Sequence, residues 1–233
     1  MQINGATALV TGANRGLGRR FAQALLDRGA AKVYAAARNP EAIDLPGVTP
    51  VRLDITDPAQ VAAAAALASD VDLLINNAGS GTGADVLGGD LADIRLEMET
   101  HYFGTLSMAR AFAPVLAANG GGALVNVLSV LSWTTAPTVG AYASAKAAEL
   151  SLTNALRLEL AAQKTLVTGL HVGYMDTDMA AHVTGPKSDP LVIANHTLDG
   201  VEAGLPEVVA DDLSRTVRAA LSGPLSNLYP DVA

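Results

Sequence analysis

The sequence predicts an α/β fold, a doubly wound parallel sheet with helices on both faces. Short apolar runs, each long enough for one strand, alternate with longer alanine- and leucine-rich segments of helical character. This alternation is typical of parallel sheets that are covered on both sides. The glycine-rich and polar motifs follow directly after the apolar runs, at the strand ends where such sheets bind ligands. The two observations together predict a ligand site along one edge of the sheet.

Composition narrows the class of protein. The chain has 233 residues, half of them apolar, which suits one large core, so we expect a single domain over residues 1–233. A net charge of −8 with only four lysines argues against nucleic-acid binding. Cysteine is absent and the four histidines lack metal-ligand spacing, so no metal is expected. Met1–Gly5 lacks the basic region of a signal peptide and no apolar stretch is long enough to span a membrane, so we expect a cytoplasmic protein without membrane partners.

The first predicted strand, 6–10, leads through a glycine-rich turn over 11–18 into a helix over 19–28, which Gly29 ends. A strand, a glycine turn and a helix N-terminus together present backbone N–H groups to an anion. The turn has the spacing G-x-x-x-G-x-G, formed by Gly12, Gly16 and Gly18. A plain strand-to-helix turn is the alternative interpretation.

The second predicted strand, 32–37, is followed by Arg38. Sites that prefer NAD place an acidic residue at this position to bind the ribose 2′-hydroxyl, whereas an arginine accommodates the 2′-phosphate of NADP. Arg15, inside the glycine turn, is a second candidate for that phosphate. Either arginine alone is equally well explained as a surface residue. Together with the missing acid, they favour NADP(H).

The middle of the chain continues the alternation. A third strand, 48–53, precedes Asp54 and a capped helix over 58–69, and a fourth strand, 71–75, ends in Asn76-Asn-Ala-Gly79. The polar residues at these two strand ends belong to the same predicted edge of the sheet.

A glycine-rich loop over 79–89 leads into a long predicted helix over 93–117. Apolar residues recur along this helix at alternating steps of four and three. His101 lies on the same stripe, so we expect its side chain to be buried.

Ser129 to Lys146 is the stretch that carries the predicted chemistry. It follows an apolar strand, 123–128, and a helix over 141–162 places Tyr142 and Lys146 four residues apart on one face. A phenol with a pKa of about 10 is a poor acid or base at neutral pH. A nearby ammonium is expected to lower that pKa toward the range useful for general acid–base catalysis. Taken alone, a Tyr–Lys pair at this spacing is more often a surface feature.

The periodicity weakens after a strand at 165–172. Residues 180–205 carry scattered glycines and prolines and are expected to be irregular, so we predict a substrate lid over 173–205. A disordered insertion is the alternative. A helix over 207–221 and a short final strand at 227–230 complete the prediction.

These motifs together resemble the short-chain dehydrogenase/reductase family, whose members have the Rossmann fold. The resemblance spans nearly the whole chain and rests on Thr11-Gly-x-x-x-Gly-x-Gly18, Asn76-Asn-Ala-Gly79, Ser129 and Tyr142-x-x-x-Lys146. It implies that Tyr142 is the general acid that protonates a carbonyl oxygen and that Ser129 orients this oxygen. It also implies that Lys146 lowers the pKa of Tyr142 and holds the nicotinamide ribose.

The resemblance further implies which residues surround the cofactor and the substrate. The cofactor-binding residues would be Thr11, Gly12, Asn14, Arg15, Gly16, Leu17, Gly18, Arg38, Asp54, Ile55, Asn77, Ala78, Gly79, Tyr142, Lys146, Gly173, Met175 and Thr177. The substrate-binding residues would be Ser129, Trp133, Tyr174 and Met179. The apolar character of the last three suggests a largely uncharged ketone or aldehyde, with ordinary packing as the alternative for each.

Two positions depart from the family pattern. His101 stands where the family has an asparagine whose backbone carbonyl holds a water in a proton relay. A histidine keeps that carbonyl, so we expect activity to survive and count His101 among the predicted catalytic residues. A neutral, hydrogen-bonded core histidine is the alternative. Val172-Gly173 replaces the family Pro-Gly, which removes a rigid residue but no chemical group.

The resemblance predicts an NADP(H)-dependent oxidoreductase that interconverts a ketone or aldehyde and an alcohol by hydride transfer. We expect it to act on a small molecule as a homodimer or homotetramer. The Tyr–Lys spacing argues against enoyl reductases, and the retained glycines and Lys146 argue against halohydrin-cleaving relatives. A non-catalytic NADP(H)-binding sensor or scaffold protein of the same fold remains the alternative.

Overall fold

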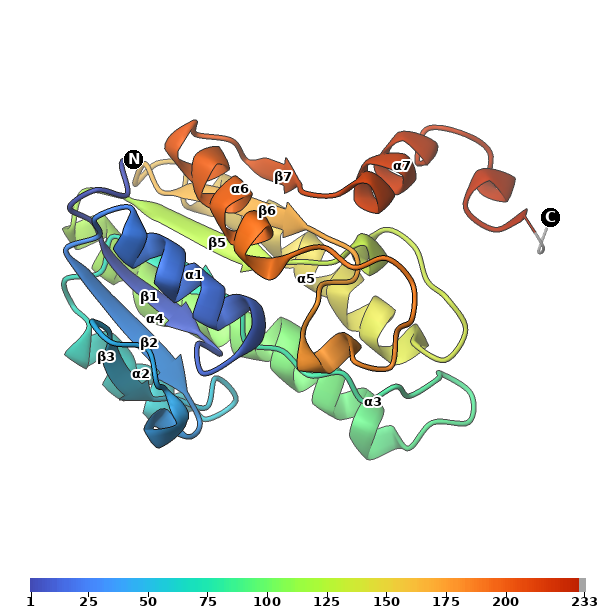
Figure 1. Ribbon diagram of the computed structural model, residues 1–233, viewed down its shortest axis with the longest axis horizontal. Helices are drawn as coiled ribbons and strands as arrows, with labels where there is room; N and C mark the ends of the chain where they lie inside the picture. Colours follow the sequence, from blue (N-terminus) through green and yellow to red (C-terminus); the bar gives the residue numbers. More distant parts are fainter. Residues whose placement is uncertain (231–233) are drawn as a thin grey trace.

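The computed structural model of the protein describes residues 1–230 and is built around a seven-stranded sheet in the order β3-β2-β1-β4-β5-β6-β7 (Figure 1). All neighbouring strands are parallel. The chain moves outward from the central pair β1 and β4 in opposite directions. Open parallel sheets with such a switch point usually bind ligands beyond the carboxyl ends of these two strands. The predicted fold class is therefore confirmed. The strands are β1 (Thr7–Thr11), β2 (Lys32–Ala37), β3 (Thr49–Arg52), β4 (Leu73–Asn76), β5 (Ala123–Val127), β6 (Leu166–His171) and β7 (Glu207–Val209).

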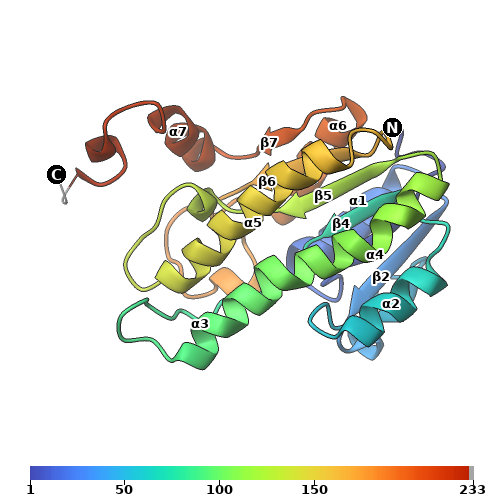
Figure 2. The same cartoon turned by 180° about the vertical axis from the view of Figure 1, so that it is seen from behind.

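Helices cover both faces of the sheet. Figure 1 shows α1 (Gly16–Asp27) and α6 (Pro190–Glu202) on one face. Figure 2 shows α2 (Pro58–Leu67), α4 (Thr105–Ala118) and α5 (Gly140–Glu159) on the other. No helix within residues 1–230 combines the length and the apolar character that a bilayer crossing requires.

Each face of the sheet has its own apolar core. Phe21 of α1 packs in the same buried cluster as Val10 of β1, and Phe112 of α4 packs in the opposite cluster with Leu9. Leu9 and Val10 are neighbours in one strand, so their side chains point to opposite faces. Both aromatic side chains are fully buried. A strand that contributes side chains to both cores is a continuous run of apolar residues in the sequence. All strands predicted up to residue 172 are therefore found, with bounds that differ by at most two residues.

The predicted helix over 93–117 is divided. α3 (Leu91–Met98) and α4 are joined by a π-helical segment, Glu99–Gly104. The apolar steps of three and four are compatible with either geometry, so the sequence pattern does not reveal the wider turn. Such turns occur frequently at functional sites. His101 lies inside this segment and is buried, as the stripe predicted.

The C-terminal prediction is wrong in three places. Residues 180–205 were expected to be irregular, yet 190–202 form α6. Pro190 is the first residue of α6, a position where the backbone N–H has no partner within the helix, so proline loses no hydrogen bond there. The side chain of Asp189 caps α6 by accepting from Leu191 N at 2.7 Å. A Cβ at Gly200 would overlap Val208, so this glycine lets α6 lie against β7 rather than ending the helix.

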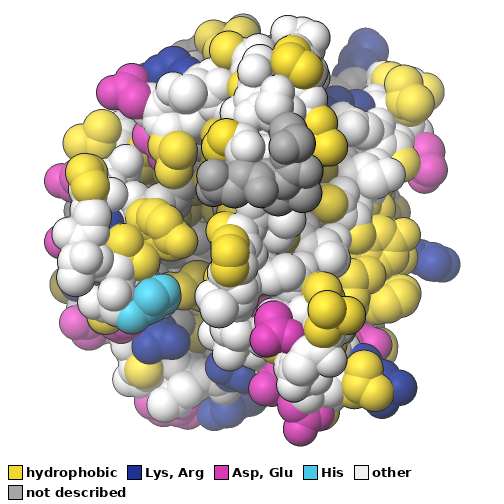
Figure 3. Space-filling model, turned by 90° about the vertical axis from the view of Figure 1, so that its right-hand side faces the viewer, with side chains coloured by type: hydrophobic (Ala, Val, Ile, Leu, Met, Phe, Trp, Pro, Cys, Tyr) yellow, Lys and Arg dark blue, Asp and Glu magenta, His cyan; other side chains and the backbone are white. Residues whose placement is uncertain are grey.

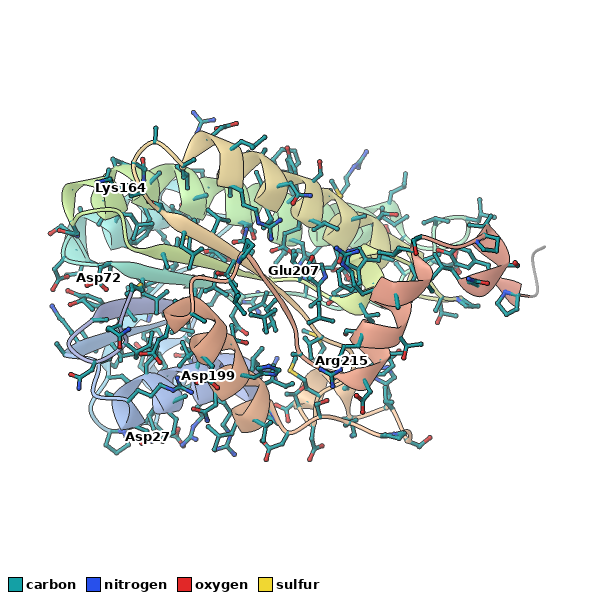
Figure 4. The ribbon with its side chains drawn as sticks, turned by 90° about the horizontal axis from the view of Figure 1, so that it is seen from above. Asp27, Asp72, Lys164, Asp199, Glu207 and Arg215 are labelled. Atoms are coloured by element: carbon teal, nitrogen blue, oxygen red, sulfur yellow. The ribbon has the colours of Figure 1, made fainter. Side chains whose placement is uncertain are left out.

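The expected helix over 207–221 is the edge strand β7 followed by the shorter helix α7 (Asp212–Ala220). Residues 225–227 form a 3-10 turn, and the expected strand at 227–230 is absent. Figure 1 shows α7 and the tail extending beyond the end of the sheet. Arg215 ties α7 back to β7 by donating to Val209 O at 3.1 Å, and Figure 4 labels Arg215 in α7 and Glu207 in β7.

Candidate active site

The turn between β1 and α1 is shaped by glycines. Gly12 and Gly16 have φ values of +66° and +53°, a left-handed conformation that favours glycine. A Cβ at Gly18 would overlap Gly12 O and the side-chain nitrogen of Asn77. The first turn of α1 contains no acidic residue, and Arg15, at its N-cap, makes no side-chain capping hydrogen bond. The helix N-terminus is therefore able to receive an anion.

The strand ends around this turn are held together by side chains of β1 and β4. Thr11 Oγ1 accepts from Asn77 N and Ala78 N, both at 2.9 Å. Asn77 Nδ2 in turn donates to Thr11 O at 2.8 Å, and Asn76 Nδ2 donates to Asn126 Oδ1 at 2.9 Å across to β5. These hydrogen bonds join the carboxyl ends of β1, β4 and β5 to one another.

The two arginines predicted to hold a 2′-phosphate lie on the surface of this edge. Arg38 follows β2 and is exposed, and its backbone oxygen accepts from Arg52 Nη1 at 3.0 Å. Arg15 Nη1 lies 3.3 Å from Asp178 Oδ2, with both side chains largely exposed. An exposed ion pair of this kind contributes little stability, so Arg15 is free to exchange its partner for a phosphate. Asp54 Oδ1 accepts from Thr56 N at 3.0 Å.

Ser129, Tyr142 and Lys146 converge at the carboxyl end of β5. Ser129 caps a 3-10 turn, its side chain accepting from Leu131 N at 3.1 Å, while Tyr142 and Lys146 stand in the first turns of α5. Lys146 Nζ donates to Val127 O at 2.7 Å and lies 5.8 Å from the centre of the Tyr142 ring. The ammonium is thus held beneath the phenol by the backbone of the strand.

Burial decides the pKa of Tyr142. Burial of the Tyr142 side chain raises its pKa, whereas the charge of Lys146 and a hydrogen bond with Ser129 lower it. The net pKa of Tyr142 lies above its usual value. The expected lowering of the Tyr142 pKa is therefore wrong for its net direction, because burial and the nearby Glu149 and Glu97 outweigh the ammonium. Burial also acts to lower the pKa of Lys146, but the opposing charge of Glu149 leaves that pKa raised. Both groups thus keep their protons at neutral pH.

Sequence reasoning missed two buried carboxylates beside these groups. Glu149 Oε2 accepts from Lys146 Nζ at 2.7 Å, and Glu97 Oε2 lies 3.2 Å from His101 Nε2. Hydrogen bonds from His101 and from the loop at Thr82 hold the pKa of Glu97 at about 2, against the effect of burial. The helical spacing could have revealed both carboxylates. Glu97 lies four residues before His101, and Glu149 lies three residues after Lys146, so each pair shares one face of its helix. The buried faces of these helices carry no other charged residue.

His101 lies between the loop that follows β4 and the side chain of Tyr142. A Cβ at Gly79 would lie 2.8 Å from the His101 ring, and the ring meets Tyr142 edge-on at 5.1 Å between centroids. His101 Nε2 is 3.0 Å from Ser80 O. The predicted histidine thus stands between the Asn76–Gly79 motif and the phenol.

The predicted substrate walls differ in how open they are. Trp133 stacks on His171 with 3.7 Å between ring centroids, so one of its faces is occupied by packing. Tyr174 and Met179 are 44% and 54% exposed.

Thr177 lies close to Gly16 of the glycine turn. A Cβ built on Gly16 would lie 3.5 Å from Thr177 Cγ2. The end of the molecule that carries these segments shows hydrophobic side chains scattered over its middle and charged ones mainly toward its rim (Figure 3).

Comparison with known proteins identifies the family. The family model for short chain dehydrogenases matches residues 6–187. A short-chain dehydrogenase from Penicillium ochrochloron is 37% identical over 181 residues, which cover 73% of this chain and 66% of that protein. A sorbitol dehydrogenase from Cereibacter sphaeroides is 34% identical over 191 residues, covering 76% of this chain and 73% of the relative. The chain belongs to the short-chain dehydrogenase/reductase family.

A solved structure is similar over nearly the whole length. A short chain dehydrogenase from Burkholderia cenocepacia J2315, in complex with NADP, has a TM-score of 0.95 to this structure. The two are 42% identical over 99% of this chain and 98% of that one. By contrast, the chain spans just under two thirds of the length of the Penicillium relative.

Proposed function

We propose that the protein is an NADP(H)-dependent oxidoreductase that interconverts a ketone or aldehyde and an alcohol by hydride transfer. The observation that carries this proposal is the convergence of Ser129, Tyr142 and Lys146 at the carboxyl edge of the sheet. The contact chain through Asn77, Gly79 and His101 joins them to the glycine turn. Family membership and the likeness to an NADP complex support the cofactor.

The glycine turn fits the pyrophosphate of a dinucleotide. The space a Cβ would need at Gly18 is taken by Gly12 O and Asn77, so the backbone of the turn stays bare and close to the sheet. Gly12, Gly16 and the N-terminus of α1 would hold the pyrophosphate. Arg15 and Arg38 would bind a 2′-phosphate by charge-assisted hydrogen bonds. The absence of an acid at position 38 supports NADP(H) over NAD(H).

Hydrogen bonds from the Ser129 and Tyr142 hydroxyls would orient a carbonyl oxygen between them. A bound nicotinamide supplies the hydride to the carbonyl carbon. Tyr142 then gives its proton to the oxygen, and the ammonium of Lys146 stabilises the phenolate that forms. The raised pKa of Tyr142 means that the phenol holds the proton it must give at neutral pH.

The protonation state of Tyr142 determines how the reaction rate should depend on pH. Reduction needs the protonated phenol, so its rate is expected to hold through neutral pH and to fall as the pH rises through the raised pKa of Tyr142. Oxidation needs a proton acceptor and is expected to gain rate over the same interval. Steady-state rates in both directions, measured as a function of pH, check this.

The substrate would lie beneath residues 173–189, which we propose as the lid in place of the longer segment expected from the sequence. Tyr174 and Met179 offer exposed apolar surface for an uncharged substrate. Met179 also lies against the loop at Gly81, so the lid is joined to the opposite wall. We also propose a homodimer or homotetramer through α4 and α5, supported by the exposed apolar side chains of Phe103, just before α4, and Leu158, in α5.

Consumption of NADPH and NADH with a panel of ketones and aldehydes tests the proposed function. We expect NADPH to be preferred, and Tyr142→Phe to lose turnover by about 10²–10⁴-fold, the usual contribution of a general acid. Tyr102→Phe, a half-buried phenol outside the site, is the matched control and should keep its rate. Turnover that survives Tyr142→Phe would contradict the proposed mechanism. Tight NADPH binding without turnover of any carbonyl would favour the sensor alternative.

A further inference from the structure

His171 is a buried titratable side chain that takes no part in the mechanism above. It is the last residue of β6, which pairs with β5, the strand that leads to Ser129. It is 0% exposed, and burial holds its pKa at about 4, so the ring is neutral at neutral pH. A neutral imidazole carries one hydrogen, either on Nδ1 or on Nε2. The contacts of the two nitrogens decide between these forms.

The Nδ1 atom of His171 faces the backbone of Ser129. It lies 3.1 Å from Ser132 Oγ and 3.4 Å from Ser129 O. Ser132 Oγ is itself 2.6 Å from Ser129 O, a distance at which a hydrogen lies between two oxygens, so this hydroxyl donates to the carbonyl. With its hydrogen used in this way, the hydroxyl can only accept from Nδ1. Nδ1 therefore carries the hydrogen of the neutral ring.

The surroundings of Nε2 lead to the same assignment. Nε2 is buried and has no hydrogen-bond partner among residues 1–230. The carboxylate oxygen Oε1 of Glu207, on β7, is 3.7 Å away, which is beyond hydrogen-bond distance. The other oxygen of Glu207 accepts from Arg218 Nε at 3.2 Å. A hydrogen on Nε2 would be a buried donor without an acceptor, and such a donor is costly.

The indole of Trp133 holds the plane of the His171 ring. The two rings stack with 3.7 Å between their centroids and 12° between their planes. Arg218 of α7 lies over the same indole, 5.6 Å from its centroid. Because Trp133 directly follows Ser132, one short turn provides both the acceptor for Nδ1 and the surface that fixes the direction of its N–H bond.

The hydrogen bonds of Ser132 converge on the carbonyl oxygen of Ser129. Ser132 donates to this oxygen twice, from its backbone N at 2.9 Å and from its hydroxyl at 2.6 Å. These bonds close the 3-10 turn in which Leu131 N donates to Ser129 Oγ at 3.1 Å. The same Ser129 hydroxyl forms a hydrogen bond with Tyr142. The position of the Ser129 side chain thus depends on the turn that Ser132 closes.

We propose that His171 and Ser132 are positioning residues for the reduction. The Nδ1–H of His171 holds the Ser132 hydroxyl against the carbonyl of Ser129, and this contact directs the Ser129 side chain toward the substrate oxygen. Both side chains are buried, so they act through Ser129 and do not contact the substrate. The inference deepens the proposed function and rests on it.

The first experiment removes the Ser132 hydroxyl. We expect Ser132→Ala to lower kcat by roughly 10- to 100-fold, because a small displacement of a group that orients the substrate is costly. The dissociation constant of NADPH should stay unchanged. The matched control is Ser214→Ala, which alters a buried serine of α7 whose hydroxyl has no partner in the described part of the chain. It should keep the wild-type kcat, and a wild-type kcat in Ser132→Ala would overturn the proposal.

A double-mutant cycle shows whether Ser132 acts through Ser129. When the Ser129 hydroxyl is already absent, its orientation no longer matters. Adding Ser132→Ala to Ser129→Ala should therefore change the single-turnover rate by less than about twofold. A general structural loss would instead lower the rate by the same factor in both backgrounds, and that result would overturn the proposal.

Two amide substitutions of His171 separate its hydrogen bond from its packing. The side-chain N–H of asparagine lies near the position of Nδ1, whereas that of glutamine lies near the position of Nε2. Both variants lose the stack on Trp133, so urea unfolding should show a similar loss of stability in the two. We expect kcat of His171→Asn to be roughly 5- to 10-fold higher than that of His171→Gln, the effect of one hydrogen bond. Equal kcat values would overturn the proposal.

A measurement on the ring does not depend on turnover. Nitrogen NMR of wild type, with the His171 signals assigned by their loss in His171→Asn, should show hydrogen on Nδ1 and a bare Nε2. The Nδ1–H signal should move in Ser132→Ala, which removes its acceptor, and stay in place in Ser214→Ala. Hydrogen on Nε2, or an unmoved signal in Ser132→Ala, would overturn the proposal. Wild-type turnover that is lost in Tyr142→Phe would still uphold the proposed function in that case.

Discussion

The two ends of the site are built in different ways. At the cofactor end, the β1–α1 turn depends on glycines that have no side chain. Gly12 and Gly16 adopt positive φ values that would strain other residues, and a Cβ at Gly18 would overlap its neighbours. At the proposed catalytic end, charged groups that are rarely buried, Lys146 and Glu149 among them, are packed into the interior. The first end is defined by steric exclusion and the second by electrostatics. Adding atoms should therefore damage the one, and removing charge should damage the other.

Removal of one buried charge is expected to have the largest effect on stability. Glu149→Gln leaves the ammonium of Lys146 buried with its counter-charge lost. The free energy of unfolding should fall by about 3–5 kcal/mol, the usual cost of breaking a buried ion pair from one side. Urea unfolding measures this change. The double variant Lys146→Met/Glu149→Leu is the control, and it should lose less than Glu149→Gln alone because no unpaired charge remains.

Acid is expected to destabilise the proposed catalytic end through Glu97. Its pKa of about 2 in the folded protein lies below the usual 4.5, so its contribution to stability is present above about pH 4.5 and is lost as the pH falls toward 2. Over that interval the free energy of unfolding should decline by roughly 3 kcal/mol more in wild type than in Glu97→Gln. Thermal unfolding as a function of pH compares the two. Equal slopes would show that Glu97 is not held in its charged form.

Addition of one methyl group is expected to damage the cofactor end. In Gly18→Ala the new Cβ overlaps Gly12 O and Asn77, and the cost of such overpacking is typically about 1–3 kcal/mol. The free energy of unfolding should fall by that amount and NADPH affinity should fall with it. Gly185→Ala meets no atom within 4 Å and adopts no positive φ, so it should leave both quantities unchanged. Full NADPH affinity in Gly18→Ala would show that steric exclusion does not define the turn.

The smallest expected effect is on cofactor choice. Arg38→Ala should weaken NADPH binding by about tenfold, or about 1.4 kcal/mol, and leave NADH binding nearly unchanged, because only the 2′-phosphate differs. Titration calorimetry with both cofactors measures the two affinities. Arg110→Ala, an exposed arginine of α4, is the matched control. Equal losses for NADPH and NADH would remove Arg38 from the 2′-phosphate site.

The elements that the sequence predicted correctly are those whose neighbours along the chain determine them. The strands up to residue 172 are apolar runs between turn residues. The glycine spacing of the first turn indicates its backbone conformation directly, as the positive φ values of Gly12 and Gly16 show. The cap of α2 follows from Asp57 and Pro58, and the Asp57 side chain accepts from Ala59 N at 2.9 Å. Each of these features is local, so its signal survives in the linear chain.

The errors arise where a distant contact changes the meaning of a residue. Pro190 and Gly200 were interpreted as breakers, but the first begins α6 and the second lets α6 pack on Val208. The strand β7 exists because β6 offers it an edge: Val208 aligns with Leu170 in the register. Periodicity alone carries no information about either partner.

By itself, the sequence determined the alternation of strands and helices, the glycine turn, and the placing of Tyr142 and Lys146 on one helical face, because each depends on spacing along the backbone. Only the tertiary structure decided the electrostatics of the site. The burial that raises the pKa of Tyr142, and the meeting of Glu97, His101 and Glu149 around Lys146, bring together helices separated by some fifty residues. The energy of a charge depends on the groups and the solvent around it, and the fold alone specifies that environment.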